Sequence, residues 1–184
     1  MIIQLTGLSG SGKTTLANRM KFLFSHQSTK IEVIDGDEYR KTLCSDLGFS
    51  KEDRFENIRR LGKLAAELMS DQCFPIISAI NPFEIPRLEL KNNYGASTVW
   101  IKCAVDTLIH RDTKGLYKRA LLPNDHPDKL HNLTGINDVY ELPAAPDLII
   151  DTSVDTIDQS AEKLYRFILA LNPARNAERF QRMI

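Results

Sequence analysis

A glycine-rich octapeptide near the start of the chain constrains the fold more than any other feature. It runs from Gly7 to Thr14, reads GLSGSGKT and matches the pattern G-x-x-x-x-G-K-[ST]. The apolar run 2–6 precedes it, and the pattern of residues 13–24 favours a helix. Glycines let successive backbone N–H groups turn toward one anion, and the following helix adds its positive end. The sequence therefore predicts a phosphate-binding loop between a buried strand and a helix.

The side chains of this loop fit the triphosphate of ATP bound with Mg²⁺. Lys13 supplies a point charge to the β- and γ-phosphates, and the Thr14 hydroxyl is a ligand for Mg²⁺. The expected contacts to ATP are Gly7, Ser9, Gly10, Ser11, Gly12, Lys13, Thr14 and Thr15. The alternative is a glycine-rich turn without a ligand, which the flanking strand and helix patterns disfavour.

Short apolar runs alternate with helical patterns along the rest of the chain. Strands are predicted at residues 2–6, 31–35, 74–79, 98–103 and 148–150, and helices at 13–24, 53–72 and 155–171. Apolar strands separated by helices pair in parallel, because the helices cover both sheet faces. We therefore expect an α/β fold of the P-loop NTPase type, a three-layer sandwich with a five-stranded parallel sheet and helices on both faces. This domain is expected over residues 1–172, with a C-terminal tail at 173–184.

Residues 111–146, which we call the lid segment, break this alternation. They hold four prolines and two glycines and have little strand character. A long irregular stretch inside a compact domain is usually a lid or a binding loop. The alternative is a disordered insertion. It is disfavoured because Leu116, Tyr117, Leu121 and Leu122 give the segment side chains to pack.

The charge balance limits the partners of this chain. Lys plus Arg and Asp plus Glu both total 24, so the formal net charge is zero, which argues against binding to nucleic-acid polymers. No segment approaches the roughly 18 apolar residues that span a bilayer, and the first residues do not resemble a signal peptide. We therefore expect no membrane association and a cytoplasmic location.

The cysteines and histidines show no metal-binding pattern. Cys44, Cys73 and Cys103 have wide spacings and no CxxC pair, which argues against a zinc site and a disulfide framework. Cys73 and Cys103 sit in apolar runs and are expected as buried thiols. The histidines at 26, 110, 126 and 131 form no spaced cluster and are expected in surface or loop positions.

Two carboxylates follow the second predicted strand. Asp35 and Asp37 lie where that strand ends, and ligands of parallel sheets collect outside the carboxyl ends of the strands. One carboxylate could hold a metal-bound water, and the other could accept the proton of an acceptor hydroxyl. The alternative is a helix N-cap followed by an acid in the first turn.

The helix predicted from residue 53 carries charge on its inward face. Leu61, Leu64 and Leu68 follow a 3,4 spacing, and extending this spacing backwards reaches Asn57 and Arg54. A buried guanidinium needs a partner, which is either a protein carboxylate or an anionic ligand in a cleft. Further candidates for one anion pocket are Arg40 and Arg87.

These motifs together resemble the adenylylsulfate kinase (APS kinase) family. The matching stretches read GLSGSGKTT from Gly7, DGDEYR from Asp35, DLGFSKEDRFENIRR from Asp46, RDTKGLYKRA from Arg111, LTGINDVYELP from Leu133 and PDLIIDT from Pro146. They follow the family's order and cover most of residues 1–152. The resemblance implies transfer of the γ-phosphoryl of ATP, with Mg²⁺, to the 3′-hydroxyl of adenosine 5′-phosphosulfate (APS). The products are ADP and PAPS, and a homodimer is an expected assembly.

The resemblance also implies roles for individual residues. Lys13, Asp37 and Asp35 form the catalytic set, with Asp37 facing the acceptor hydroxyl and Thr14 with Asp35 holding the metal. Arg111 approaches the ATP side. The acceptor is gripped by Arg40, Arg54 and Asn57 and stacks on Phe49. Its remaining expected contacts are Asp37, Ile80, Lys114, Gly115 and Leu116.

The chain departs from the family pattern at three positions and in the lid. Asn81 stands where many members carry a serine that is phosphorylated in some, and Glu84 stands in place of an arginine. Leu133 replaces the second stacking aromatic, and the lid segment is longer around residues 122–130. Two further hypotheses follow: a kinase with another nucleotide-linked anionic acceptor, and a nucleotide-binding module without catalysis.

Overall fold

Five parallel strands form the centre of the molecule. The computed structural model describes residues 1–27, 29–70 and 72–171. The strands are β1 (Ile3–Thr6), β2 (Lys30–Asp35), β3 (Cys73–Ser78), β4 (Ser97–Lys102) and β5 (Leu148–Asp151). Their order is β2-β3-β1-β4-β5, and in register Ile3 of β1 pairs with Ile76 of β3 and Ser97 of β4. The phosphate-binding loop therefore leaves the middle strand of the sheet.

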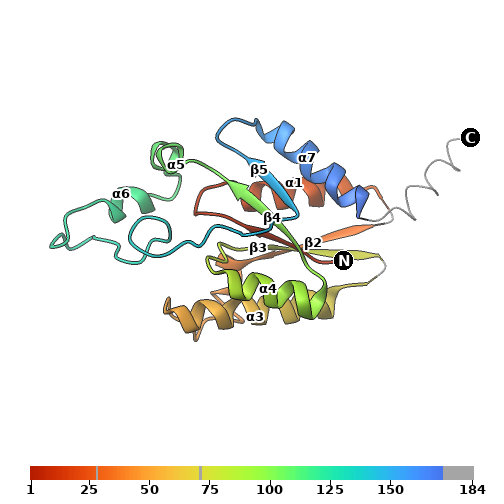
Figure 1. Cartoon of the computed structure of the whole chain (residues 1–184), viewed down its shortest axis with the longest axis horizontal. Helices are drawn as coiled ribbons and strands as arrows, with labels where there is room; N and C mark the ends of the chain where they lie inside the picture. Colours follow the sequence, from red (N-terminus) through yellow and green to blue (C-terminus); the bar gives the residue numbers. More distant parts are fainter. Residues whose placement is uncertain (28, 71, 172–184) are drawn as a thin grey trace, which may run out of the picture.

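Helices cover both faces of this sheet (Figure 1). On one face lie α1 (Lys13–Phe24) and α7 (Ile157–Ala170), and on the other lie α3 (Lys51–Leu68) and α4 (Glu84–Tyr94). Ile3 and Leu5 point into the core beneath α1 and α7, whereas Ile2 points into the core beneath α3 and α4. Because both faces are buried, the strands read as continuous apolar runs. The predicted three-layer α/β sandwich is confirmed.

Helix α3 begins and ends earlier than predicted. The Ser50 side chain caps it by accepting from the backbone N–H of Asp53 at 3.1 Å, and the backbone turns extended at Met69. Its buried stripe runs through Arg54, Asn57, Ile58, Leu61, Gly62 and Ala65. The backward extension of the apolar spacing was therefore correct. Its forward end was wrong, because Leu68 is the last helical residue and is 36% exposed.

Four helices were absent from the sequence-based prediction. Besides α4, these are α2 (Gly36–Tyr39), α5 (Val105–Arg111) and α6 (Leu116–Ala120). Helix α4 was not predicted because Pro86 reads as a helix breaker. Proline is nevertheless tolerated in the first turn, where backbone N–H groups have no partner inside the helix. Gly95, with a φ of 63°, ends α4 in the left-handed conformation that glycine adopts readily.

The lid segment follows α5 and extends beyond the sheet (Figure 1). A small apolar cluster packs it, formed by Leu108, Tyr117, Ala120 and Leu133. Of the four residues expected to pack, Tyr117 is buried and Leu116 is half-buried, whereas Leu121 is 54% exposed. The tail predicted at 173–184 lies outside the described residues.

The cysteine prediction was wrong in detail. Cys73 and Cys103 are half-buried, because Cys73 begins β3 and Cys103 follows β4, where the sheet meets its loops. Cys44 is fully buried instead. All four histidines are exposed.

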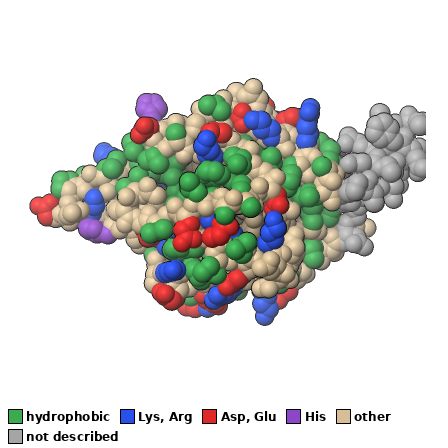
Figure 2. Space-filling model, in the orientation of Figure 1, with side chains coloured by type: hydrophobic (Ala, Val, Ile, Leu, Met, Phe, Trp, Pro, Cys, Tyr) green, Lys and Arg blue, Asp and Glu red, His purple; other side chains and the backbone are tan. Residues whose placement is uncertain are grey.

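Charge of both signs is spread over the surface. Blue and red side chains alternate on the face shown in Figure 2, so that face presents no broad basic field for a polyanion. Within the part of the chain that the structure describes, no helix has the length and apolar character needed to cross a membrane.

Candidate active site

The phosphate-binding loop connects β1 to α1 and folds tightly at its glycines. Gly12 is the N-cap residue of α1 and has a φ of 99°, a left-handed conformation that glycine adopts without steric cost. Gly7 has no room for a side chain, because a Cβ there would overlap the backbone oxygen of Ile101. The loop thus sits at the carboxyl edge of the sheet, against the positive end of a helix.

Lys13 lies buried in the first turn of α1 and points back into the loop. Its Nζ donates to the backbone oxygens of Gly7 at 2.9 Å and Leu8 at 2.8 Å. Burial lowers the pKa of Lys13 to about 8, although the nearby Asp37 carboxylate acts in the opposite direction. An anionic phosphate would strongly stabilise this ammonium, because the ammonium is buried away from water and is bound only to neutral carbonyl oxygens.

Thr14 and Asp35 meet at the mouth of the loop. Thr14 Oγ1 donates to Asp35 Oδ2 at 2.7 Å and lies 3.2 Å from Ser78 Oγ. Asp35 also caps α2, because its Oδ1 accepts from the backbone N–H of Asp37 at 2.9 Å. The cap role weighed from the sequence is therefore confirmed for Asp35, and its second carboxylate oxygen lies at the loop through Thr14.

This oxygen pair fits a magnesium ion that arrives with a nucleotide. Mg²⁺ prefers hard oxygen ligands and takes few from protein, because water and phosphate oxygens complete its octahedron. Thr14 and Asp35 offer one hydroxyl and one carboxylate. The described residues hold no group of three or more His, Cys, Asp or Glu side chains that could bind a metal alone.

Two cavities meet at Asp37. The phosphate cavity, of about 210 Å³, lies over the loop and is lined by residues that include Lys13, Thr14, Thr15, Asp35 and Lys114. The second cavity, of about 290 Å³, is lined by residues that include Arg40, Phe49, Arg54, Asn57 and Leu133. Ser9, Asp37, Ala79 and Ile80 line both. Asp37 also forms an ion pair with Lys114 at 2.5 Å, which joins α2 to the lid segment.

Arg40 and Phe49 form one wall of the second cavity. The Arg40 guanidinium carbon lies 4.5 Å from the centre of the Phe49 ring, within cation–π range. Arg40 Nη1 donates to the backbone oxygen of Gly48 at 2.8 Å, whereas its Nε and Nη2 have no partner among the described residues. Burial and the charge of Arg54 lower the pKa of Arg40. This wall therefore offers free N–H donors beside an aromatic ring that is 55% exposed.

Arg54 lines the same cavity from the first turn of α3. It is 7% exposed, and its partner is a protein carboxylate, Asp138 Oδ2, at 2.5 Å. Its Nη1 donates to Thr134 Oγ1 at 2.9 Å, its Nη2 also donates to the Asn132 backbone oxygen at 3.1 Å, and its Nε donates to the Phe49 backbone oxygen at 3.0 Å. The carboxylate alternative considered for this buried guanidinium is thus present, and the guanidinium also lines a cavity in which an anionic ligand stays a prediction.

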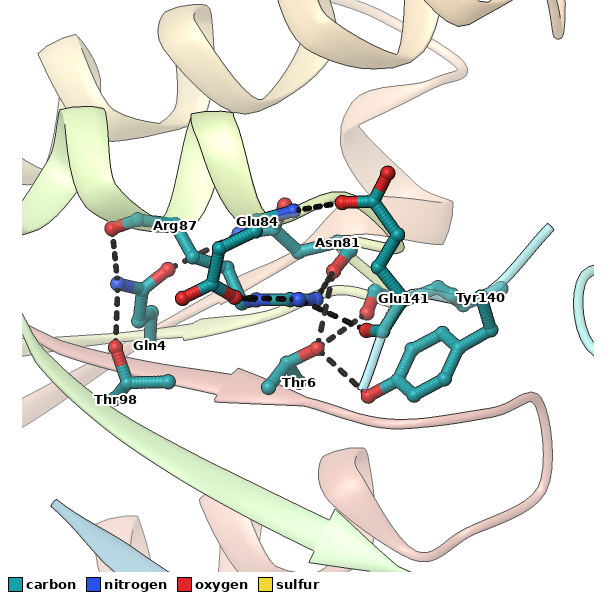
Figure 3. A network of polar contacts seen from close by, with 9 residues as sticks. Gln4, Thr6, Asn81, Glu84, Arg87, Thr98, Tyr140 and Glu141 are labelled. Atoms are coloured by element: carbon teal, nitrogen blue, oxygen red, sulfur yellow. Dashed lines mark hydrogen bonds and ion pairs between the residues drawn. The ribbon is translucent and has the colours of Figure 1, made fainter. Parts of the chain in front are cut away.

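Arg87 does not belong to this anion pocket, and that part of the sequence interpretation was wrong. It is 2% exposed, and its Nε and Nη2 donate to Glu84 Oε2 at 2.8 and 2.6 Å. Its Nη1 donates to the Asn81 backbone oxygen at 2.8 Å (Figure 3). Glu84 therefore neutralises Arg87 and lies outside the lining of the second cavity.

The same network fastens the end of the lid segment to the sheet (Figure 3). Tyr140 Oη lies 3.1 Å from Thr6 Oγ1, one residue before the phosphate-binding loop. Glu141 accepts from Arg87 Nη2 through its backbone oxygen at 2.8 Å, and its carboxylate accepts from the Glu84 backbone N–H at 2.7 Å. The lid segment is thus held beside β1 at this end.

The remaining predicted site residues divide between the two cavities. Asn57 and Leu116 line the second cavity, Ile80 lines both cavities, and Lys114 lies on the phosphate side. Gly115, with a φ of 65° before α6, lines neither. Arg111 lies behind the loop, where its Nη2 donates to the Thr152 backbone oxygen at 2.8 Å and it borders a hollow beside Gly10. The roles assigned to these residues stay predictions.

Sequence reasoning did not single out Asp138 and Tyr140, whose side chains contact Arg54 and Thr6 beside the site. Both lie in the stretch LTGINDVYELP, which has no regular helix or strand and so no periodicity that would place its side chains. The one available signal was the need of Arg54 for a carboxylate.

Comparisons with known proteins give consistent findings. A family model described as adenylylsulphate kinase matches residues 1–151. A probable adenylyl-sulfate kinase from Aeropyrum pernix is 34% identical over 176 residues, which cover 93% of each chain. A probable bifunctional SAT/APS kinase from Sorangium cellulosum is 39% identical over 164 residues, which are 89% of this chain and only 27% of that protein. The structure of the APS kinase of Mycobacterium tuberculosis in complex with AMPPNP and APS aligns with a TM-score of 0.82 at 31% identity, covering 91% of this chain and 96% of that one.

Proposed function

Because the chain belongs to the adenylylsulphate kinase family, we propose that it transfers the γ-phosphoryl group of ATP to the 3′-hydroxyl of APS. The observation that carries this proposal is the pair of adjoining cavities that share Asp37. One cavity contains the phosphate-binding loop, and the other combines an aromatic wall with two arginines. A donor triphosphate and an anionic nucleotide acceptor therefore fit side by side.

The mechanism follows from the position of each group. Lys13 neutralises charge on the β- and γ-phosphates, and the backbone N–H groups of the loop hold them in place. Asp37 lies where the acceptor hydroxyl would approach and accepts its proton. Lys114 keeps the Asp37 carboxylate on the phosphate side through their ion pair. Catalysis of this kind depends on positioning and charge neutralisation.

Mg²⁺ would be held by Thr14 and Asp35 and would supply neutralisation of the charge on the β- and γ-phosphates. The lid segment, by covering both cavities, would exclude water and limit wasteful hydrolysis of ATP. A homodimer and a cytoplasmic location remain predictions, supported by the resemblance and by the use of ATP respectively.

An assay of ADP release tests the proposal. With ATP and Mg²⁺, adding APS is expected to raise the rate at least about a hundredfold over the rate without acceptor. Asp37→Asn is expected to lower kcat by about 10²-fold or more through loss of the general base. Glu38→Gln, on the same helix but in a surface pair with Lys41, is the matched control and should retain activity. ADP release that does not depend on APS would refute the assignment.

Leu133 favours a second candidate acceptor class. It lines the second cavity with an aliphatic side chain, so a base there has one aromatic wall, Phe49, instead of two. Loss of a stacking partner costs about 0.5–1.5 kcal/mol and weakens discrimination between bases. Other nucleotide-linked anions in the same assay would identify such an acceptor by a higher kcat/KM than APS.

A further inference from the structure

The acceptor side of the site contains a fixed arginine and a freer one. Arg54 has five N–H groups, and four of them have partners in its own chain. Arg40 is bound through Nη1 alone among the described residues. Arg54 is therefore the rigid member of the pair, with one Nη1 N–H left for a ligand.

Three of the partners of Arg54 come from a tight turn in the lid segment, namely Asn132, Thr134 and Asp138. The Leu133 N–H donates to Asn137 Oδ1 at 2.8 Å, and the Gly135 N–H donates to the Asp138 backbone oxygen at 2.8 Å. The Asp138 carboxylate is fixed at both oxygens, because Oδ1 accepts from the Val139 N–H at 2.8 Å and Oδ2 accepts from Arg54. The turn thus presents an oriented carboxylate to the guanidinium.

Asp138 binds Arg54 but does not itself line the second cavity. Arg54, Thr134 and Asn132 line the second cavity, whereas Asp138 does not. An acceptor anion in that cavity would therefore meet Arg54 without displacing Asp138. A carboxylate in this place neutralises a buried charge and fixes the guanidinium plane, because charge-assisted hydrogen bonds are strong and directional.

We propose that Asp138 is a positioning residue of the acceptor site, which fixes the orientation of the Arg54 guanidinium in the wall of the second cavity. The proposal rests on the proposed function, because it needs an anionic acceptor in the second cavity. It also assigns Arg40, with its free Nε and Nη2, to follow the anion, while Arg54 provides the fixed point.

The experiment compares substitutions in two Arg–Asp pairs whose arginines, Arg54 and Arg60, both lie on α3. Asp138→Ala is expected to raise the APS KM, and the APS Kd measured by calorimetry with ADP and Mg²⁺, by about tenfold or more, with the ATP KM within about twofold. Asp138→Asn keeps an oxygen for Nη2 and should give an intermediate rise of about threefold. Asp46→Ala removes one of the two carboxylate partners of Arg60, outside both cavities, and should leave APS binding within about twofold of the unsubstituted chain.

The outcomes separate the two claims. An Asp138→Ala variant whose APS Kd matches that of Asp46→Ala, or whose ATP KM rises in parallel, overturns the positioning role. If that variant does not fold, Asp138→Asn decides alone, and an unchanged APS Kd overturns the role. An unsubstituted chain that binds APS without transferring phosphate refutes the proposed function, while the Kd comparison still decides the role of Asp138. An unsubstituted chain that binds no APS overturns both.

Discussion

Replacing Lys13 by methionine should stabilise the empty protein while it abolishes catalysis. The ammonium of Lys13 is buried, and burial lowers its pKa from 10.5 to about 8. At 1.36 kcal/mol per pH unit, this shift corresponds to about 3 kcal/mol of lost stability at pH 7. Methionine has a similar shape and no charge to bury.

The hydrogen bonds of Lys13 offset part of this gain. Its Nζ binds two backbone oxygens, of Gly7 and Leu8, and losing each costs about 1 kcal/mol. The net gain at pH 7 is therefore about 1 kcal/mol, which raises Tm by about 2–4 °C in a chain of this size.

The pH dependence identifies the cause. Because the pKa of Lys13 is lower in the folded state, the unfolded chain binds more protons between about pH 8 and pH 10.5, and the stability of the unsubstituted protein rises across that range. The advantage of Lys13→Met is therefore full below pH 8 and shrinks by pH 10. Calorimetric melts without nucleotide at pH 7 and pH 10 measure it, with the exposed Lys63→Met as control. A lower Tm at pH 7, or a difference that does not change with pH, would refute the reasoning.

Three further substitutions test separate parts of the site. Gly7→Ala should abolish ATP binding in calorimetric titrations, because the added Cβ overlaps the Ile101 backbone oxygen and must displace the loop; retained binding would contradict the close approach. Glu84→Ala should lower Tm by about 6–12 °C, since it leaves Arg87 buried without its carboxylate at a cost of about 3 kcal/mol, yet leave the APS KM unchanged; a raised APS KM would place Glu84 in the acceptor site. Phe49→Ala should raise the APS KM about tenfold in initial-rate assays with a Tm within about 2 °C, because the ring is 55% exposed and its role is to stack; an equal loss of ATP affinity would argue against that role.

The sequence predicted best where chemistry and periodicity coincide. The loop from Gly7 to Thr14 and helix α1 follow the predicted bounds, because glycine geometry and a regular apolar stripe both act locally. Arg54 and Asn57 were placed on the buried face of α3 from spacing alone, and the structure buries both. The five strands each lie within one residue of prediction at either end.

Partners separated by long stretches of chain could not be predicted in the same way. Arg54 and Asp138 are brought together by the path of an irregular segment, which carries no period from which a direction could be read. Glu84 was noted as a residue in place of an arginine, whereas a helical turn places its carboxylate on Arg87, three residues away. The pairing of Glu84 with Arg87 depends on helix α4, which was not predicted because of Pro86.

Tyr140 and Glu141 attach the end of the lid segment to β1 and to α4, so this end is held independently of the chain that leads to it. A peptide-bond break at the exposed tip of the lid segment, around residues 124–128, would leave the downstream piece clamped by these contacts and by the pairing of β5 with β4. The two pieces would remain one body. The part of the lid segment that lines the second cavity with Asn132, Leu133 and Thr134 therefore does not need an unbroken chain through the tip. Insertions and deletions can accumulate at the tip without altering the chemistry.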